Sequence, residues 1–424
     1  MIDAKIIRQL RTLDWDFPES IQGTSANIHW YPGTFPVQLP FSLIQALSSR
    51  DKLIFDPFGG IGFSATEALR IGRRAWIVEN NPIAFLTSYA TCGLILLSSI
   101  DRSLTDYTLN YLNDAVMMNR DISHSHTLFS TRKMINIDRI LSRLMSPSPK
   151  LVCNSFFIKS SNWNELSHWY GDFTLSAIKK LWNYVNNSVD SYFLRIISFV
   201  MLSDSLKVCS SQTRSWGHIA DNCLPKTFIE KNLFSFLFRW VSKTSKMLFN
   251  ANIDTIAQLD NTDRRFWATY HDWTSGAILS NIPPTKANLL LTSPPYGGAI
   301  DYIKAQRLSL YLLGYDQHDI NSLSSKEIGA RCKRFSSNSR SDWALDLSRS
   351  IEIQLNYLSD TSIIVIILPH KDSGRDVGNN LLIDTLLNCG WSVTFRTDRS
   401  IRKLRTRQSW SSIKKETIYV FTKE

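Results

Sequence analysis

The chain of 424 residues has a formal net charge of +11, with 43% hydrophobic and 20% charged residues. This composition supports a large buried core and excludes an intrinsically disordered chain. The six cysteines form no C-x-x-C pair, which argues against a structural zinc site or a disulfide framework. We therefore expect a reduced, cytoplasmic protein without a metal site. The positive excess is compatible with an acidic partner such as nucleic acid.

The first residues contain no long apolar run, so we expect no secretory signal. Apolar stretches such as residues 362–368 are too short to span a bilayer. The sequence therefore predicts no membrane partner.

A strand–turn–helix–strand pattern opens the chain. Residues 53–55 form an apolar strand, and the glycine-rich turn DPFGGIG follows at 56–62. Residues 63–69 combine helix formers with apolar spacing, and a second strand over 75–78 ends at Glu79. This order predicts a βαβ unit.

The glycine turn favours a nucleotide-type cofactor. A turn between a strand and a helix presents backbone N–H groups and lets a ligand approach the backbone closely. Glu79 lies near the spacing of about 20 residues expected for an acid that accepts hydrogen bonds from ribose hydroxyls. The glycines do not form G-x-G-x-x-G, which disfavours a dinucleotide. The alternative is that they only build a tight turn.

The middle of the chain differs from its ends. Residues 101–255 lack glycine-turn signals and carry amphipathic patterns, for example at 175–185 and 192–208. They predict a mostly helical insertion of domain size, between two α/β parts at 1–100 and 256–424. In the second part, strands are expected at 288–292, 362–368, 391–396 and 417–422, with a helix at 379–388.

A rigid turn, Ser293-Pro294-Pro295-Tyr296, follows the strand at 288–292. Two prolines end the strand and stiffen the turn. The Ser293 hydroxyl and the Pro294 carbonyl are suited to accept hydrogen bonds from an exocyclic amine, whose lone pair then faces an electrophile. Tyr296 is suited to stack on a base. The alternative is a proline-stiffened loop in which Tyr296 only packs.

The two motifs together resemble a known family. DPFGGIG, followed by a strand and Glu79-Asn80-Asn81-Pro82, resembles the S-adenosylmethionine-binding motif of amino-group DNA methyltransferases. Ser293-Pro294-Pro295-Tyr296 resembles the catalytic motif of the same family. The resemblance implies an α/β fold with a Rossmann-like, seven-stranded, mostly parallel sheet. It also implies that residues 1–100 and 256–424 form the catalytic domain and that the insertion at 101–255 is a target-recognition domain.

The resemblance implies site residues as well. Phe35 and Pro36 match a segment that closes over the methionine end of the cofactor, and Asp272 matches an acid that accepts from the adenine amine. For Asp272, capping of a helix at 274–279 fits the sequence nearly as well. The expected cofactor-binding residues are Phe35, Pro36, Asp56, Pro57, Phe58, Gly60, Gly62, Glu79, Asn80 and Asp272; the expected catalytic residues are Ser293, Pro294, Pro295 and Tyr296.

The implied reaction transfers a methyl group from S-adenosylmethionine to an exocyclic amine of a DNA base that has left the stack. No Pro-Cys pair occurs, which disfavours methylation at cytosine C5. The order of the motifs is more common among adenine-N6 enzymes, whereas the Ser-Pro-Pro-Tyr form is more common among cytosine-N4 enzymes; we favour cytosine N4. The alternatives are an RNA base-amine methyltransferase and a catalytically degenerate DNA-binding subunit of a defence complex.

Two basic stretches flank the proposed catalytic strands. From them we expect Lys333, Arg334, Arg402, Arg405 and Arg407 to contact DNA phosphates. The alternative is a solvated face without a partner. The expected partners are DNA and a cognate restriction or defence nuclease.

Overall fold

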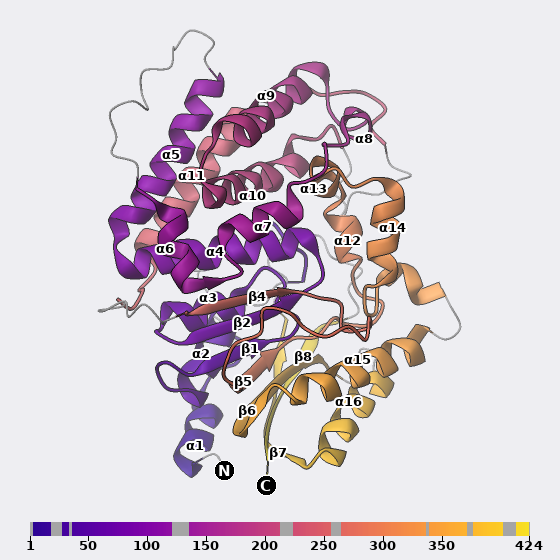
Figure 1. The fold of residues 1–424 in the computed structure, drawn as a ribbon. Helices are drawn as coiled ribbons and strands as arrows, with labels where there is room; N and C mark the ends of the chain where they lie inside the picture. Colours follow the sequence, from indigo (N-terminus) through magenta and orange to yellow (C-terminus); the bar gives the residue numbers. More distant parts are fainter. Residues whose placement is uncertain are drawn as a thin grey trace.

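The computed structural model describes residues 3–17, 28–33, 36–120, 135–212, 224–255, 264–335, 339–370, 376–401 and 413–423, apart from the side chains of 334, 335 and 339. Helices and strands alternate at both ends of the chain, and helices dominate its middle (Figure 1). In chain order the elements are α1 (Ala4–Thr12), α2 (Gln38–Leu47), β1 (Leu53–Asp56), α3 (Phe63–Arg70), β2 (Arg74–Glu79), α4 (Pro82–Ile100), α5 (Arg102–Arg120), α6 (Ile137–Leu144), β3 (Met145–Ser146), α7 (Pro149–Phe156), α8 (Trp163–Ser167), α9 (Asp172–Ser188), α10 (Tyr192–Cys209), α11 (Leu233–Asn250), β4 (Phe266–Tyr270), β5 (Ala287–Thr292), α12 (Tyr302–Ala305), α13 (Arg307–Leu312), α14 (Gln317–Ser325), η2 (Arg331–Phe335), α15 (Ser339–Leu355), β6 (Leu358–Pro369), α16 (Asp376–Asn388), β7 (Trp391–Ser400) and β8 (Lys415–Lys423).

The strands form one sheet of eight, in the order β3-β4-β2-β1-β5-β6-β8-β7. Strand pairs are parallel except those of β8, which runs antiparallel to β6 and β7. The predicted Rossmann-like, mostly parallel fold class is therefore confirmed. The sheet has one strand more than the expected seven because the two-residue β3, within the predicted insertion, pairs with β4.

Apolar side chains cover both faces of the central strands, as expected for a parallel sheet between helices. Ile54, Ile77 and Leu289 belong to a core shared with α3, α4 and the helical middle of the chain. Phe55 and Leu290 point to the other face and pack with α15 and α16. These strands therefore read as continuous apolar runs, which is why the sequence predicted them well.

Helix α4 lies at the centre of the molecule. It is long and apolar enough to cross a membrane by length and composition, but 94% of its most apolar window is buried inside the molecule. The expectation that all apolar stretches are short overlooked this helix. Its burial on all sides explains a composition without a polar face.

The described part of residues 101–255 is helical apart from β3, and it lies above the sheet in Figure 1. Its helices α5, α9, α10 and α11 share one hydrophobic core with α4 and with one face of the sheet. This layer is thus continuous with the sheet core. The predicted domain boundaries and the target-recognition role stay predictions.

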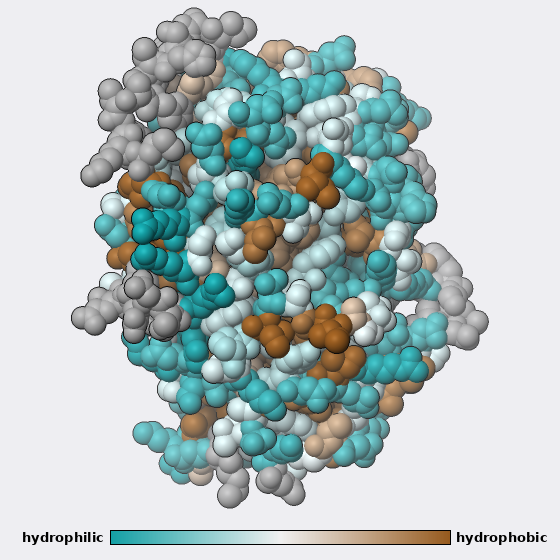
Figure 2. Space-filling view, in the orientation of Figure 1, coloured by the Kyte–Doolittle hydropathy of each residue, from teal (hydrophilic) through white to brown (hydrophobic). Residues whose placement is uncertain are grey.

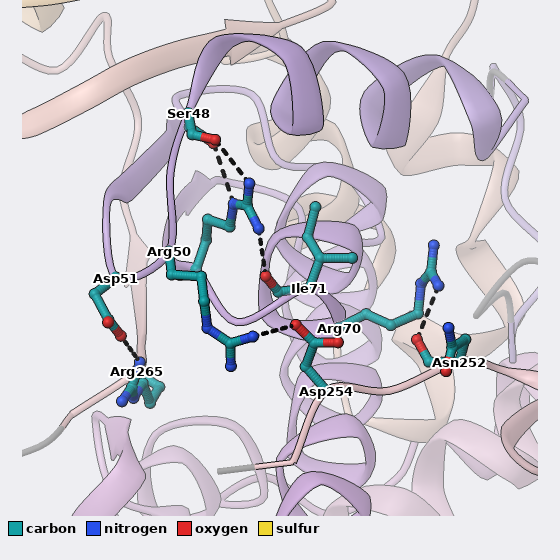
Figure 3. Close-up of polar contacts among 9 residues, drawn as sticks. Ser48, Arg50, Asp51, Arg70, Ile71, Asn252, Asp254 and Arg265 are labelled. Carbon is teal, nitrogen blue, oxygen red and sulfur yellow. Dashed lines mark hydrogen bonds and ion pairs between the residues drawn. The ribbon is translucent and has the colours of Figure 1, made fainter. Parts of the chain in front are cut away.

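A polar cluster holds the amino-terminal edge of the central strands (Figure 3). Arg50, before β1, pairs with Asp254 at 2.9 Å, and Arg265, before β4, pairs with Asp51. Arg70 donates to the Asn252 carbonyl at 3.0 Å. The segment after α11 therefore binds at the amino-terminal edge of the sheet, opposite to the carboxyl ends of the strands.

Candidate active site

The strand order reverses beside β1, and the predicted motifs meet there. The chain passes from β1 to β2 and β4 on one side, and β5 and β6 lie on the other. Open parallel sheets bind ligands outside the carboxyl ends of the strands at such a switch point. Asp56, Glu79 and Thr292 are the last residues of β1, β2 and β5.

Asp56 joins the glycine turn to the catalytic strand. Its carboxylate accepts hydrogen bonds from Thr292 Oγ1 at 2.7 Å, from Ser64 Oγ and from the Phe58 N–H at 3.2 Å. Burial raises the pKa of Asp56 to about 6, although these three hydrogen bonds lower it. The side chain therefore fixes β1, α3 and β5 relative to one another.

Glu79 lies across the glycine turn from Asp56. Its carboxylate accepts from the N–H groups of Gly60 at 2.7 Å, Asn81 at 2.8 Å and Asn80 at 3.0 Å. Burial raises the pKa of Glu79 to about 7, while these backbone hydrogen bonds lower it. A carboxylate has about four acceptor positions, so one is left for a ligand hydroxyl.

A pocket opens between these strand ends, with about 940 Å³ of empty space when its solvent-open mouth is included. This volume suits a nucleoside-sized ligand. Among the expected site residues, the pocket is lined by Asp56, Pro57, Phe58, Gly60, Glu79, Asn80, Ser293 and Pro295. Gly62, Pro294 and Tyr296 are not among the residues that line it. The structure thus brings the two motifs, far apart in the chain, to one cavity.

The wall also contains residues that are not among the expected site residues, chiefly Tyr31, His271, Trp273, Tyr302 and Glu327. The rings of Tyr31 and Tyr302 stack with centroids 5.5 Å apart. Glu327 accepts from the N–H groups of Tyr302 at 2.7 Å and Ile303 at 3.3 Å. Burial raises the pKa of the Glu327 carboxyl to about 8. Glu327 belongs to no recognisable sequence motif, and it reaches the pocket only through the tertiary fold.

The Ser293-Pro294-Pro295-Tyr296 turn is held from behind. The Trp343 indole N–H on α15 donates to the Pro295 carbonyl at 2.9 Å. A Cβ atom at Gly297, Gly329 or Gly378 would lie 2.6, 2.6 or 2.1 Å from the Trp343 ring. Glycine is therefore required at these three positions so that Trp343 can pack against the turn.

Asp272 lies beside the pocket, not among the residues that line it. Its carboxylate accepts from the Thr274 N–H at 2.9 Å and from Thr274 Oγ1 at 2.8 Å. The helix considered at 274–279 does not form, so Asp272 caps a turn instead. Its neighbour Trp273 lines the pocket and donates its indole N–H to the Pro57 carbonyl at 2.7 Å.

The amino-terminal segment reaches the pocket through Tyr31 and Gly33. Phe35 lies outside the described residues. Pro36 is not in the pocket wall; its carbonyl accepts the Leu39 N–H at 3.0 Å, at the start of α2. The segment therefore reaches the pocket through residues other than Pro36, and its role over the cofactor stays a prediction.

Most residues predicted to contact DNA lie outside the part of the chain that the structure describes. Arg402, Arg405 and Arg407 lie outside the described residues, as does the side chain of Arg334. The Lys333 ammonium donates to the carbonyls of Ser325 and Glu327, both at 2.7 Å. Lys333 thus stabilises the Glu327 loop, which is a structural role that the charge pattern did not suggest.

Comparison with known proteins supports the motif assignment. Residues 9–89 match the family model N6_N4_Mtase, described as DNA methylase. These residues are similar to a DNA methylase domain. The match runs from the end of α1 through α2, the glycine turn and Glu79, and so it confirms the resemblance of the predicted cofactor motif. The Ser293-Pro294-Pro295-Tyr296 turn lies outside the matched residues.

A solved structure, the rRNA methyltransferase aviRa from Streptomyces viridochromogenes, is similar over 96% of this chain and 94% of that chain. The identity is 8% and the TM-score 0.31. No curated protein matches the chain.

Proposed function

We propose that this protein is a methyltransferase that uses S-adenosylmethionine to methylate an exocyclic amine of a DNA base after base flipping, with cytosine N4 favoured and adenine N6 next. The observation that carries the proposal is that Ser293 and Pro295 line the same pocket as Asp56, Gly60 and Glu79. A pocket shared by both motifs is what direct transfer from cofactor to amine requires. A cytoplasmic location and a cognate nuclease stay predictions from the sequence.

The chemistry of the pocket wall fits the cofactor. When bound, S-adenosylmethionine supplies an electrophilic methyl group on a positively charged sulfonium. The carboxyls of Asp56, Glu79 and Glu327 lie in the wall, and burial raises the pKa of each. Burial is the largest cause of each shift, so a cationic ligand beside these carboxyls would stabilise their ionised forms.

Polar and aromatic groups suit the remainder of the ligand. Glu79 keeps acceptor capacity for a ribose hydroxyl, and the Trp273 ring offers an apolar surface for an adenine. Asn81 lines the pocket, and its side-chain amide interacts with the hydroxyl of Tyr31, which lines the pocket as well. A few polar groups of this kind orient a ligand in a mostly apolar pocket.

The catalytic turn is suited to position the amine. The Ser293 hydroxyl oxygen and the Pro294 carbonyl would accept its two hydrogens and leave its lone pair free. The reaction needs no covalent nucleophile, so the protein contributes orientation and exclusion of water. Asp56 holds Thr292, the residue before Ser293, which keeps the turn in register with the cofactor motif.

Transfer of a labelled methyl group to duplex DNA and to total RNA tests the proposal. We expect the wild type to label DNA. Ser293→Ala should bind S-adenosylmethionine normally and lose activity on the order of 100-fold, because an amine acceptor is removed. Ser322→Ala, at an exposed position of α14, is the matched control and should keep full activity. Labelling of RNA alone, or full activity of Ser293→Ala, would contradict the proposal.

A further inference from the structure

A chain of hydrogen bonds runs from the catalytic turn to the antiparallel edge of the sheet. The Ser293 hydroxyl is 3.0 Å from the Tyr296 hydroxyl, which is 3.0 Å from Glu416 Oε1 on β8 and 3.4 Å from the Ile367 carbonyl on β6. Glu416 pairs with Arg399, directly across from it on β7. None of these contacts beyond Tyr296 belongs to a motif.

The far end of this chain is fixed in place. Arg399 and Glu416 are 4% and 7% exposed. Arg399 Nε also donates to the Trp15 carbonyl at 3.2 Å, and the Ser400 N–H donates to Asp16. The Arg399 guanidinium donates to Glu416 Oε2 in a charge-assisted hydrogen bond. Glu416 Oε1 is therefore positioned to accept the Tyr296 O–H.

The direction of every proton in the chain follows. The Tyr296 O–H faces two acceptor oxygens, Glu416 Oε1 and the Ile367 carbonyl. The Tyr296 O–H must therefore donate to Glu416 or to Ile367, and its oxygen is then available only as an acceptor. The Ser293 O–H must donate to Tyr296. Its proton is thus directed away from the pocket and its lone pairs are left free.

This direction matters for a nucleophilic amine. A serine hydroxyl that rotates freely can donate its proton to the lone pair of the amine, and that lone pair must attack the methyl group. We propose that Glu416, held by Arg399, is a positioning residue that acts through Tyr296 to make the Ser293 hydroxyl an obligate acceptor toward the target amine. The inference rests on the proposed function and assigns Tyr296 an orienting role beside any stacking on the base.

Two variants break the chain at different points. Tyr296→Phe keeps the ring and removes the hydroxyl, so Ser293 loses its only required acceptor. Glu416→Gln replaces an acceptor-only group by one that can also donate, so the direction of the chain is lost. Asp398→Asn is the matched control, because Asp398 lies on the same hairpin but accepts from Thr417 Oγ1 at 2.7 Å.

Single-turnover methyl transfer and calorimetric binding of S-adenosylmethionine separate positioning from folding. We expect Tyr296→Phe and Glu416→Gln to slow the transfer step by about 10- to 100-fold, the cost of one misdirected hydrogen bond. The dissociation constant should stay within about twofold of the wild-type value, and Asp398→Asn should keep the wild-type rate. A purely structural role would instead weaken binding and rate together.

The inference is overturned if Tyr296→Phe transfers methyl groups at the wild-type rate while Ser293→Ala is inactive. If Ser293→Ala is fully active as well, the proposed function fails instead, so the two failures are distinguishable. Glu416→Gln leaves Arg399 buried without its charged partner, which is a risk to folding. Tyr296→Phe leaves no buried charge behind and decides the question if Glu416→Gln does not fold.

Discussion

Two glycines of the turn after β1 have different requirements. Gly62 caps α3 with a φ of +84°, and a Cβ there would lie 2.8 Å from the Ser88 Cβ on α4. Gly60 has a φ of +51°, and the nearest atom to an added Cβ is Tyr31 Cε1 at 3.9 Å. Gly62 thus serves packing between helices, whereas Gly60 serves the pocket.

Alanine at each position separates these requirements. Gly62→Ala should lower the free energy of unfolding by about 2–4 kcal/mol, because a left-handed backbone and a clash add up. Gly60→Ala should cost about 1 kcal/mol from the backbone alone, and it should weaken S-adenosylmethionine binding by placing a methyl group at the pocket wall. Denaturant unfolding and calorimetry measure the two effects. A larger loss of stability in Gly60→Ala would contradict this assignment.

At the scale of elements, α15 supports the catalytic turn through Trp343. Trp343→Phe keeps an aromatic ring between Gly297, Gly329 and Gly378 but leaves the Pro295 carbonyl without its donor. Loss of that partner costs about 1–3 kcal/mol. We expect lower thermal stability and slower methyl transfer, with little change in cofactor affinity. Leu345→Ala, at a 44% exposed position of the same helix, should change neither quantity. Equal methyl-transfer rates in Trp343→Phe and Leu345→Ala would show that α15 does not support the turn.

The elements also show what the sequence can and cannot predict. Strands β1, β2 and β5 and the residues at their ends were predictable, since their apolar runs and turns are local signals. Arg399 belongs to a stretch that resembles a basic loop, yet it is buried on β7 because Glu416 lies opposite on β8. Glu327 reaches the pocket, and Trp343 reaches the Pro295 carbonyl, only through tertiary packing. Pairing partners far apart in the chain leave no periodic signal, so these residues could not be predicted.

At the scale of the whole molecule, three buried carboxyl groups line the pocket of a protein whose net charge is +11. The face shown in Figure 2 is mostly hydrophilic with separate hydrophobic patches. Burial raises the pKa values of Asp56, Glu79 and Glu327 to about 6, 7 and 8. Folding therefore favours the protonated forms of these groups.

Stability should fall as pH rises through this window. An acid whose pKa is raised by folding contributes stability below its unfolded pKa, and this contribution is lost as pH rises through the folded pKa. For Glu327 the loss lies between pH 4.5 and about 8, on the order of a few kcal/mol at most. Glu327→Gln should remove this pH dependence. The free energy of unfolding of the variant minus that of the wild type should therefore become more positive as pH rises. The exposed Glu352→Gln is the control, and a pH-independent difference would contradict the assignment.

The central claim is that the two motifs form one pocket for methyl transfer to a DNA base amine. Mass-spectrometric analysis of nucleosides from DNA incubated with the protein and S-adenosylmethionine tests it most directly. We expect N4-methylcytosine, absent from the Ser293→Ala reaction, with N6-methyladenine as the next outcome within the same chemistry. DNA without either modified nucleoside, from protein that binds the cofactor, would contradict the claim.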